Sequence, residues 1–295
     1  MRVGSTRSPR RLIVNADDYG LSRGVTTGII EATERGVVTS ASMIVNLPSF
    51  SDAAARAASR PSLSLGLHFN LTTGRPLTAA PSLTRSKTGL FYPLPVLVAR
   101  ASLGRIDSSD VRRECAAQLD RMAEVGIAPT HLDSHRHVHA HPALWPAVIE
   151  AASSRGISNV RVPTEPLRAN AKDWRATLKK AGLLLCSRAS RGGAESSGTD
   201  HFYGISLQGG RSFAPRVFAL IPRLPEGTTE LMTHPGYADA ALSEHDGYTW
   251  QREDELRVLC SKELRELLLR EEIDLVSFGR RAPLSASAGK IAQHS

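Results

Sequence analysis

The chain has 295 residues, of which 41% are hydrophobic and 22% are charged, values typical of a soluble globular protein. This composition excludes wholesale disorder, collagen-like repeats and, with only three widely spaced cysteines, a small disulfide-stabilised scaffold. The net charge of +8 comes from the two ends: residues 1–11 and 280–295 hold seven basic residues and no acidic one, which leaves 30 basic against 29 acidic residues between them.

The nearly neutral central region argues against the basic stripe that marks a folded nucleic-acid-binding face. No apolar run approaches the roughly 20 residues that span a bilayer. No signal-peptide core follows the basic N-terminus. We therefore expect a cytoplasmic protein with no nucleic-acid partner and no membrane span.

Short apolar runs alternate with helical patterns along the chain, which is typical of β/α units in a parallel sheet. Strands are predicted at residues 11–16, 39–45, 63–69, 129–133, 159–162, 230–233 and 274–277. Helices are predicted at residues 24–35, 52–58, 109–125, 143–155, 173–184 and 253–270. Residues 72–107 and 187–210 are longer than ordinary connections, so we interpret them as active-site loops or locally disordered segments.

This order of elements predicts a single-domain α/β fold over residues 11–279. Its expected architecture is TIM-barrel-like, as a distorted or incomplete β/α barrel. Residues 1–10 are expected to form a flexible basic tail, and residues 280–295 a flexible C-terminal tail.

Ionisable residues follow four of the predicted strands at the point where each strand ends. The four segments are Asn15–Gly20, Gly66–Asn70, His131–His141 and Met232–Gly236. Because chemistry in a β/α barrel collects at the C-terminal ends of the strands, we expect these segments to meet in one site.

Five of the ten histidines lie between residues 131 and 141. Neutral imidazole is a common metal ligand near pH 7. In an extended segment, histidines at every second position from His135 to His141 would lie on one side. The spacing predicts a metal site, but it does not decide which histidines bind the ion and which orient the ligands.

Asp17 and Asp18 are adjacent carboxylates at the end of the first strand, and they repel each other unless a cation compensates. On an extended segment their side chains point in different directions, so one could bind a metal while the other faces a reacting water. The alternative is a pair that caps a helix or a solvated turn. An ion held by one carboxylate and two imidazoles suits hydrolysis, because it lowers the pKa of bound water and polarises a carbonyl.

Four motifs resemble those of the YdjC-like carbohydrate deacetylases, in order and in approximate spacing from about residue 11 to residue 278. They are NADDYG at Asn15–Gly20, GLHFNL at Gly66–Leu71, THLDSHRHVH at Thr130–His139 and THPGY at Thr233–Tyr237. The resemblance implies a TIM-barrel-like, metal-dependent enzyme that removes acetyl groups from N-acetylated sugars.

The resemblance also implies a role for individual residues. Asp18, His68 and His135 match metal ligands, for magnesium first and zinc as the alternative. Asp17 matches the general base that activates water. His234 matches the general acid toward the departing sugar amine.

Further residues are expected to take supporting roles. Segment 161–166 is similar to one family branch, in which Arg161 and Glu165 would lie near the sugar, although Arg161 could instead form a structural ion pair. Asn70 and Tyr237 are further candidates for sugar contacts. The remaining members of the cluster are expected to orient the metal ligands; they are His131, Asp133, His137 and His139.

The expected substrates are N-acetylglucosamine-containing sugars such as chitooligosaccharides, with release of acetate. The alternatives are the same chemistry on an N-acetylated glycolipid of the hopanoid type, a metallophosphoesterase, or a sugar-binding protein without turnover. The sequence lacks GxSxG, a P-loop and HExxH, which argues against a serine hydrolase, a P-loop kinase and a zincin. The resemblance is also compatible with a homodimer.

Overall fold

The computed structural model describes residues 8–166, 181–184, 198–208 and 213–280. The described strands are β1 (Arg10–Tyr19), β2 (Ser40–Met43), β3 (Ser64–Phe69), β4 (Leu132–Ser134), β5 (His201–Tyr203), β6 (Gly227–Thr233) and β7 (Ile273–Leu275). The described α-helices are α1 (Arg23–Glu34), α2 (Phe50–Ala58), α3 (Leu94–Ser102), α4 (Ser108–Glu124), α5 (Trp145–Ser153), α7 (Phe213–Leu220), α8 (Ala240–His245), α9 (Trp250–Leu259) and α10 (Lys262–Arg270). Short 3-10 helices are η1 (Pro81–Leu83), η2 (His135–Ala140), η4 (Ile205–Leu207) and η5 (Ile221–Arg223).

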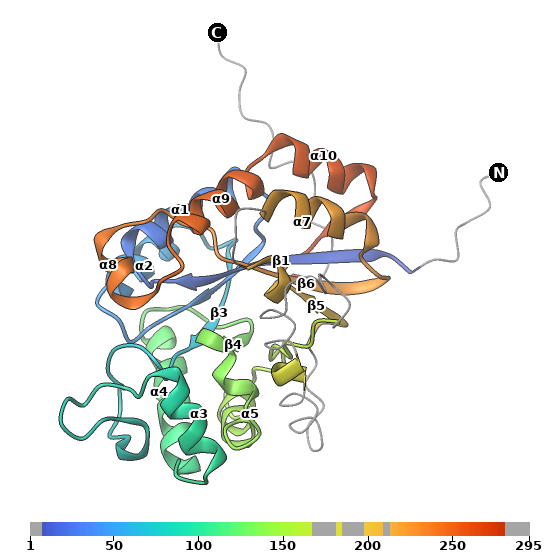
Figure 1. Ribbon diagram of the computed structural model, residues 1–295. Helices are drawn as coiled ribbons and strands as arrows, with labels where there is room; N and C mark the ends of the chain where they lie inside the picture. Colours follow the sequence, from blue (N-terminus) through green and yellow to red (C-terminus); the bar gives the residue numbers. More distant parts are fainter. Residues whose placement is uncertain (1–7, 167–180, 185–197, 209–212, 281–295) are drawn as a thin grey trace.

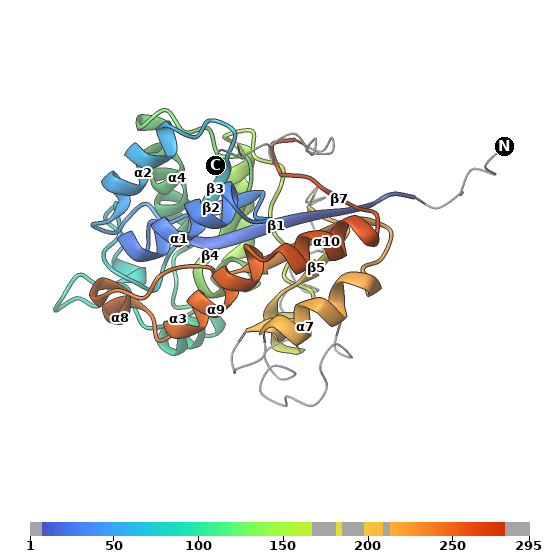
Figure 2. The same ribbon diagram turned by 90° about the horizontal axis from the view of Figure 1, so that it is seen from above.

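All of these strands pair in parallel, in the order β4-β3-β2-β1-β6-β5. β7 pairs with the first residues of β1, and β2 pairs with the later ones, so β7 and β2 share one edge of β1 while β6 takes the other. The sheet curls into a half-barrel with helices around its outside (Figures 1 and 2). The predicted α/β, TIM-barrel-like architecture with an incomplete barrel is confirmed.

Residues of β1 alternate between the two faces of the sheet with the period of two that a strand imposes. Leu12 and Val14 belong to the main hydrophobic core beneath the helices, whereas Ile13 lies in a separate small cluster on the other face. Asn15 continues that second face, and its amide donates to Asp17 at 2.8 Å. The inner face of the half-barrel therefore turns from apolar to polar toward the C-terminal end of β1.

Helix α1 fixes the segment that follows β6. The side chain of Ser22 caps the helix by accepting the amide of Val25. A Cβ added at Gly28 would lie 2.5 Å from Gly236 Cα, far closer than packed atoms approach. Glycine at this position therefore lets the helix lie directly against the backbone that carries His234.

Two predicted elements change where the chain is described. Residues 159–162 form no strand, because only a single bridge joins Val160 to Leu132 at the end of the sheet. The predicted helix at residues 253–270 is two helices: α9 ends at Leu259, and Ser261 caps α10 by accepting the amide of Leu264. Most of the predicted helix at residues 173–184 lies outside the described residues.

Residues 72–107 are not the loop or disordered segment that their composition predicts. They contain η1 and the nine-residue helix α3. The prolines that argued against a helix stand at its start, where the backbone N–H groups have no acceptor within the helix, so a proline removes no hydrogen bond there. Elements β5, α7 and α8 were likewise not predicted from the sequence.

Most of the two predicted tails lies outside the described residues. The structure describes only residues 8–10 of the N-terminal tail and residue 280 of the C-terminal tail. Arg10 is the first residue of β1 and pairs with Gly227 of β6. In the described part of the chain, no helix combines the length and apolarity that a membrane span requires.

Candidate active site

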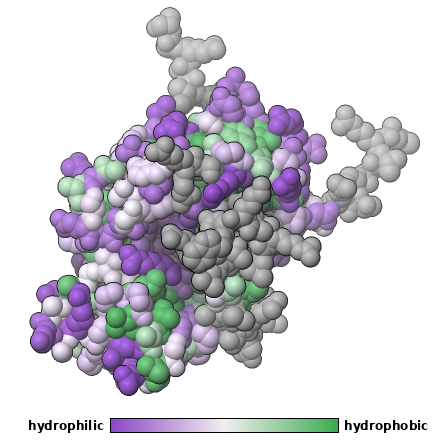
Figure 3. All heavy atoms as spheres, viewed as in Figure 1, coloured by the Kyte–Doolittle hydropathy of each residue, from purple (hydrophilic) through white to green (hydrophobic). Residues whose placement is uncertain are grey.

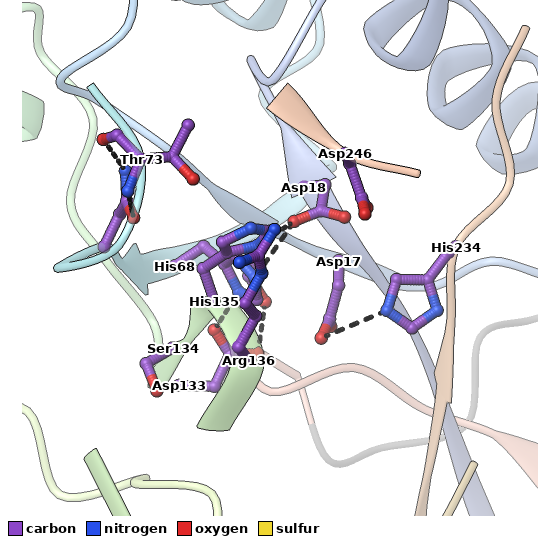
Figure 4. Close-up of polar contacts among 12 residues, drawn as sticks. Asp17, Asp18, His68, Thr73, Asp133, Ser134, His135, Arg136, His234 and Asp246 are labelled. Carbon is purple, nitrogen blue, oxygen red and sulfur yellow. Dashed lines mark hydrogen bonds and ion pairs between the residues drawn. The ribbon is translucent and has the colours of Figure 1, made fainter. Parts of the chain in front are cut away.

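The end of β1 places two neighbouring carboxylates beside one cavity. The register between β1 and β2 slips between Ala16 and Tyr19, and Asp18 adopts a left-handed backbone with φ of 74°. On a regular strand the side chains of Asp17 and Asp18 would point to opposite faces, but the irregularity lets both line the cavity. Figure 4 shows Asp18 turned toward His135 and Asp17 turned toward His234.

Three side chains from three strand ends converge on one point. Asp18 Oδ1 lies 2.8 Å from His135 Nδ1 and 3.1 Å from His68 Nε2. The three candidate ligand atoms lie within 4.8 Å of one another, and all three residues are buried. His135 Nε2 is also buried, with no hydrogen-bond partner among the described residues. A carboxylate, two imidazoles and an unsatisfied ring nitrogen fit a divalent cation.

A second combination of Asp17, His68 and Asp133 also meets the distance criterion for a metal site. Arg161, however, binds both of its carboxylates, at 2.7 Å from Asp17 and 2.6 Å from Asp133. A cation there would have to share these carboxylates with a buried guanidinium. Asp18 also gives Oδ2 to a buried guanidinium, that of Arg252, but its Oδ1 faces the two histidines, so the group that contains Asp18 is favoured.

Asp133 orients His68 from behind. Its Oδ1 lies 2.7 Å from His68 Nδ1, and its Oδ2 accepts the Ser42 hydroxyl at 2.6 Å. Burial lowers the pKa of the His68 imidazole, but the carboxylates of Asp133 and Asp17 outweigh it and raise this pKa to about 10. A carboxylate behind a ligating histidine fixes the ring and makes it more basic.

Asp18 is held ionised by its neighbours. Burial alone would raise the pKa of this carboxyl group, but His135 and Arg252 bring it well below its usual range. Arg252 Nη2 lies 2.7 Å from Asp18 Oδ2 and 2.7 Å from Asp246 Oδ2. The fully buried Arg252 thus ties α9 to the candidate metal ligand.

Asp17 is fixed by a two-pronged contact with Arg161. The two terminal nitrogens of the guanidinium donate to the two Asp17 oxygens at 2.7 Å each, and Nε donates to Glu230 at 2.8 Å. Such a fork sets both the position and the plane of the carboxylate. Burial raises the pKa of Glu230 to about 7, against the opposing effect of Arg161.

His234 lies on the other side of Asp17, with its Nε2 4.0 Å from Asp17 Oδ2. Burial lowers the pKa of the His234 imidazole to about 4, although Asp17 and Asp18 act to raise it, so the ring is neutral at pH 7. Gln208 contacts the ring, with 3.1 Å between the two Nε2 atoms. The His234 backbone N–H donates to Glu255 Oε2 at 2.6 Å, which fixes the end of β6.

The histidines of the cluster have different surroundings in the structure. The prediction that those from His135 to His141 lie on one side of an extended segment is wrong. Arg136 and His137 adopt left-handed backbones with φ of 61° and 57°, so the segment is not extended. His135 and His137 line the cavity. His139 Nε2 instead lies 2.8 Å from the Arg161 carbonyl oxygen. His141 lies beside Ser102, with 3.1 Å between Nε2 and Oγ.

His131 is a packing residue beneath the site. Its ring stacks on Phe278 with 4.0 Å between ring centroids, and burial lowers its pKa to about 4. Its Nε2 lies 3.3 Å from the Ser42 hydroxyl, which itself donates to Asp133. His131 therefore supports the ligands only through Ser42.

The residues predicted to contact the sugar have other partners in this structure. Asn70 caps a turn by accepting the amides of Thr72 and Thr73, and Glu165 accepts the amides of Gly204 and Ser206. Arg161 is buried in the ion-pair network described above, the structural alternative open from its sequence. The exposed Tyr237 donates to Glu31. The described lining of the cavity includes none of the four, so their sugar contact stays a prediction.

The cavity has a volume of about 260 Å³. Besides the predicted residues, its lining includes side chains that the sequence did not single out: Leu94, Arg136, Gln208, Met232, Asp246 and Tyr248. Tyr248 also donates to Glu255 at 2.6 Å, which joins it to the backbone of His234. Arg136 and Met232 lie within two of the four strand-end segments, whereas the other four residues come from helix starts and loops outside them, where no motif signals them.

Comparison with known proteins agrees with this geometry. The profile of the family described as YdjC-like protein matches residues 11–270. The chain belongs to the YdjC-like family. A carbohydrate deacetylase of Geobacillus stearothermophilus is 37% identical over 92% of this chain and 97% of the relative. A chitooligosaccharide deacetylase of Yersinia pestis is 35% identical over 90% and 97% of the two chains.

A solved structure resembles this YdjC-like protein over most of its length. It is the crystal structure of a candidate cellobiose-phosphate cleavage protein from Enterococcus faecalis V583, with a TM-score of 0.74 and 27% identity. The similarity covers 92% of this chain and 98% of that one. The YdjC-like half-barrel is therefore the fold of the whole described region.

Proposed function

We propose that this chain hydrolyses the N-acetyl amide of N-acetylglucosamine-containing sugars such as chitooligosaccharides, releasing acetate and a free amino sugar. One observation carries the proposal: Asp18, His68 and His135 converge while Asp17 is held separately in the same cavity, 4.0 Å from His234. The names of the relatives from Geobacillus stearothermophilus and Yersinia pestis support the same reaction.

Asp18, His68 and His135 would hold a divalent ion, magnesium or zinc. Once bound, the ion supplies a polarised carbonyl and a water of lowered pKa. The two imidazoles favour zinc, because magnesium sites are built mainly of oxygen ligands. Asp133 would hold the ring of His68, which loses its extra proton when the ion binds, and Arg252 would keep Asp18 ionised.

Asp17 accepts the proton of the attacking water in this proposal. Arg161 holds both of its oxygens, so the carboxylate meets the water in one fixed plane. His234 is neutral at rest because burial keeps its pKa near 4. It can therefore take the proton from Asp17 and deliver it to the departing nitrogen, which leaves as a neutral amine.

The test is acetate release from N,N′-diacetylchitobiose by metal-stripped protein with magnesium or zinc added back. Activity should return with one of the ions. Asp17→Asn should lower turnover by about 10²–10⁴-fold, the usual worth of a general base, while metal binding is kept. Undiminished release by Asp17→Asn would overturn the role of Asp17. No acetate release with either metal would overturn the proposed substrate.

A further inference from the structure

Residues 72–106 leave the half-barrel between β3 and α4 and carry an unusual composition. This 72–106 segment has five basic residues, Arg75, Arg85, Lys87, Arg100 and Arg105, and no acidic residue. The rest of residues 12–279 holds 25 basic and 29 acidic residues, so the positive charge of the body is concentrated in this segment. Cations without counter-charges on one projecting segment point to an anionic partner.

Large apolar side chains are exposed on the same segment. Eight large hydrophobic residues are exposed in the described chain, and four belong here: Leu77 (42%), Val96 (43%), Val98 (40%) and Leu103 (65%). Helix α3 is apolar on both faces, since Leu97 and Ala101 pack inward while Val96 and Val98 face outward. Figure 3 shows the apolar surface over α3, with strongly hydrophilic residues beside it.

The nearby carboxylates do not neutralise the outer face of the segment. Glu114 is buried and accepts the amides of Leu77 and Thr78 at 2.9 and 3.0 Å. Asp110 is buried and accepts the amide of Ser82 at 2.9 Å. The exposed Asp107 is engaged as the cap of α4. The acids thus anchor the backbone of the segment from beneath, and its exposed side chains stay cationic and apolar.

We propose that the outer face of the 72–106 segment binds peripherally to an anionic phospholipid surface. Exposed apolar side chains enter the headgroup region while neighbouring arginines and lysines meet lipid phosphates. A second copy of this chain fits less well, because a two-fold contact would set the patch against itself and bring like charges together. The inference does not depend on the proposed hydrolysis.

The location of α3 links the proposed surface to the candidate active site. Leu94, the first residue of α3, lines the cavity that contains Asp17 and Asp18. Helix α3 therefore contributes both to the proposed surface, through Val96 and Val98, and to the wall of the cavity, through Leu94.

The experiment is sedimentation of the full-length protein with vesicles of phosphatidylcholine alone, or of phosphatidylcholine and phosphatidylglycerol in a two to one ratio. Binding is expected only to the anionic vesicles and should weaken with salt. Arg85→Glu with Lys87→Glu should reduce partitioning by about tenfold to hundredfold. The matched control, Lys262→Glu with Arg270→Glu on exposed α10, makes the same charge change and should bind like wild type.

The apolar contribution is tested by a second matched pair. Leu103→Ser should weaken vesicle binding severalfold, whereas Leu269→Ser, similarly exposed at 69% but on α10, should not. An equal loss of vesicle binding in both charge variants would overturn the proposal, because the attraction would then be general. A loss of vesicle binding only in Arg2→Ser with Arg7→Ser would also overturn it, because the attraction would then come from the N-terminal tail. Self-association that disappears in Leu103→Ser, without vesicle binding, would assign the face to a second copy instead.

Discussion

Arg161 carries the charge balance of the inner face, because its guanidinium contacts the carboxylates of Asp17, Asp133 and Glu230 with only 1% of its side chain exposed. Arg161→Met would leave these carboxylates without their cation. We expect the free energy of unfolding to fall by about 3–5 kcal/mol, the usual cost of breaking a buried ion pair from one side. Urea unfolding of the metal-free protein measures it.

The control for Arg161 is Arg112→Met, which removes an exposed ion pair with Glu150. Such surface pairs contribute about 0–1 kcal/mol, so this variant should unfold close to wild type. Arg161→Lys keeps the charge but loses the fork, and it should fall between the two. Similar losses in Arg112→Met and Arg161→Met would contradict the assigned role.

Glu230 makes stability depend on pH near neutrality. Its pKa rises from an ordinary 4.5 to about 7 in the folded chain, chiefly through burial. Between these values the folded state keeps a proton that the unfolded state has released, so its contribution to stability falls as pH rises through this range and levels off above it. Because Glu255 has a similarly raised pKa, Glu230→Gln should remove only part of the pH dependence: between pH 5 and 7, with chelator present, its Tm should fall less than that of the wild type, and parallel curves would refute the shift.

At the scale of elements, the contact of α1 with the segment after β6 determines where His234 lies. Gly28→Ala would place a methyl group 2.5 Å from Gly236 Cα, which the backbone can relieve only by moving. We expect a loss of about 1–3 kcal/mol in stability, as for other overpacked sites, together with lower turnover at unchanged metal content. Denaturant unfolding and metal analysis of one preparation measure both effects.

Gly182→Ala is the matched control for Gly28→Ala, because an added methyl group there meets no atom within 4 Å. It lies in a helical part of the chain, so the substitution should leave stability unchanged or slightly raised. If Gly28→Ala behaved in the same way, the close approach of α1 to Gly236 would not position the site.

At the scale of the whole molecule, the candidate metal ligands join three strands that are remote in sequence. A bound ion stabilises only the folded arrangement, so adding metal to stripped protein should raise the Tm, by the equivalent of about 3 kcal/mol at a hundredfold excess over Kd. His135→Ala should abolish this rise. His141→Ala, a partly exposed histidine outside the ligand group, should retain it, and equal responses would place the ion elsewhere.

The sequence alone predicted the architecture, and it placed the proposed site at the C-terminal ends of the strands. Apolar runs such as Leu12–Ala16 alternate with helical patterns, and this periodicity is local, so it predicts β/α units without knowledge of their packing. Parallel strands then bring their C-terminal ends to one edge. For this reason residues as distant as Asp18, His68 and His135 could be expected in one site.

Only the tertiary structure decided how these residues are arranged around the cavity. The left-handed backbone of Asp18 turns two adjacent carboxylates to one cavity, and those of Arg136 and His137 bend the histidine segment so that His139 and His141 contact other partners. Neither conformation follows from spacing. Arg252 and Glu255 were not predicted as site residues, because charged side chains in a helical pattern indicate its solvated face. In the fold both are buried. Burial and partner geometry depend on contacts between distant segments, which local sequence patterns do not encode.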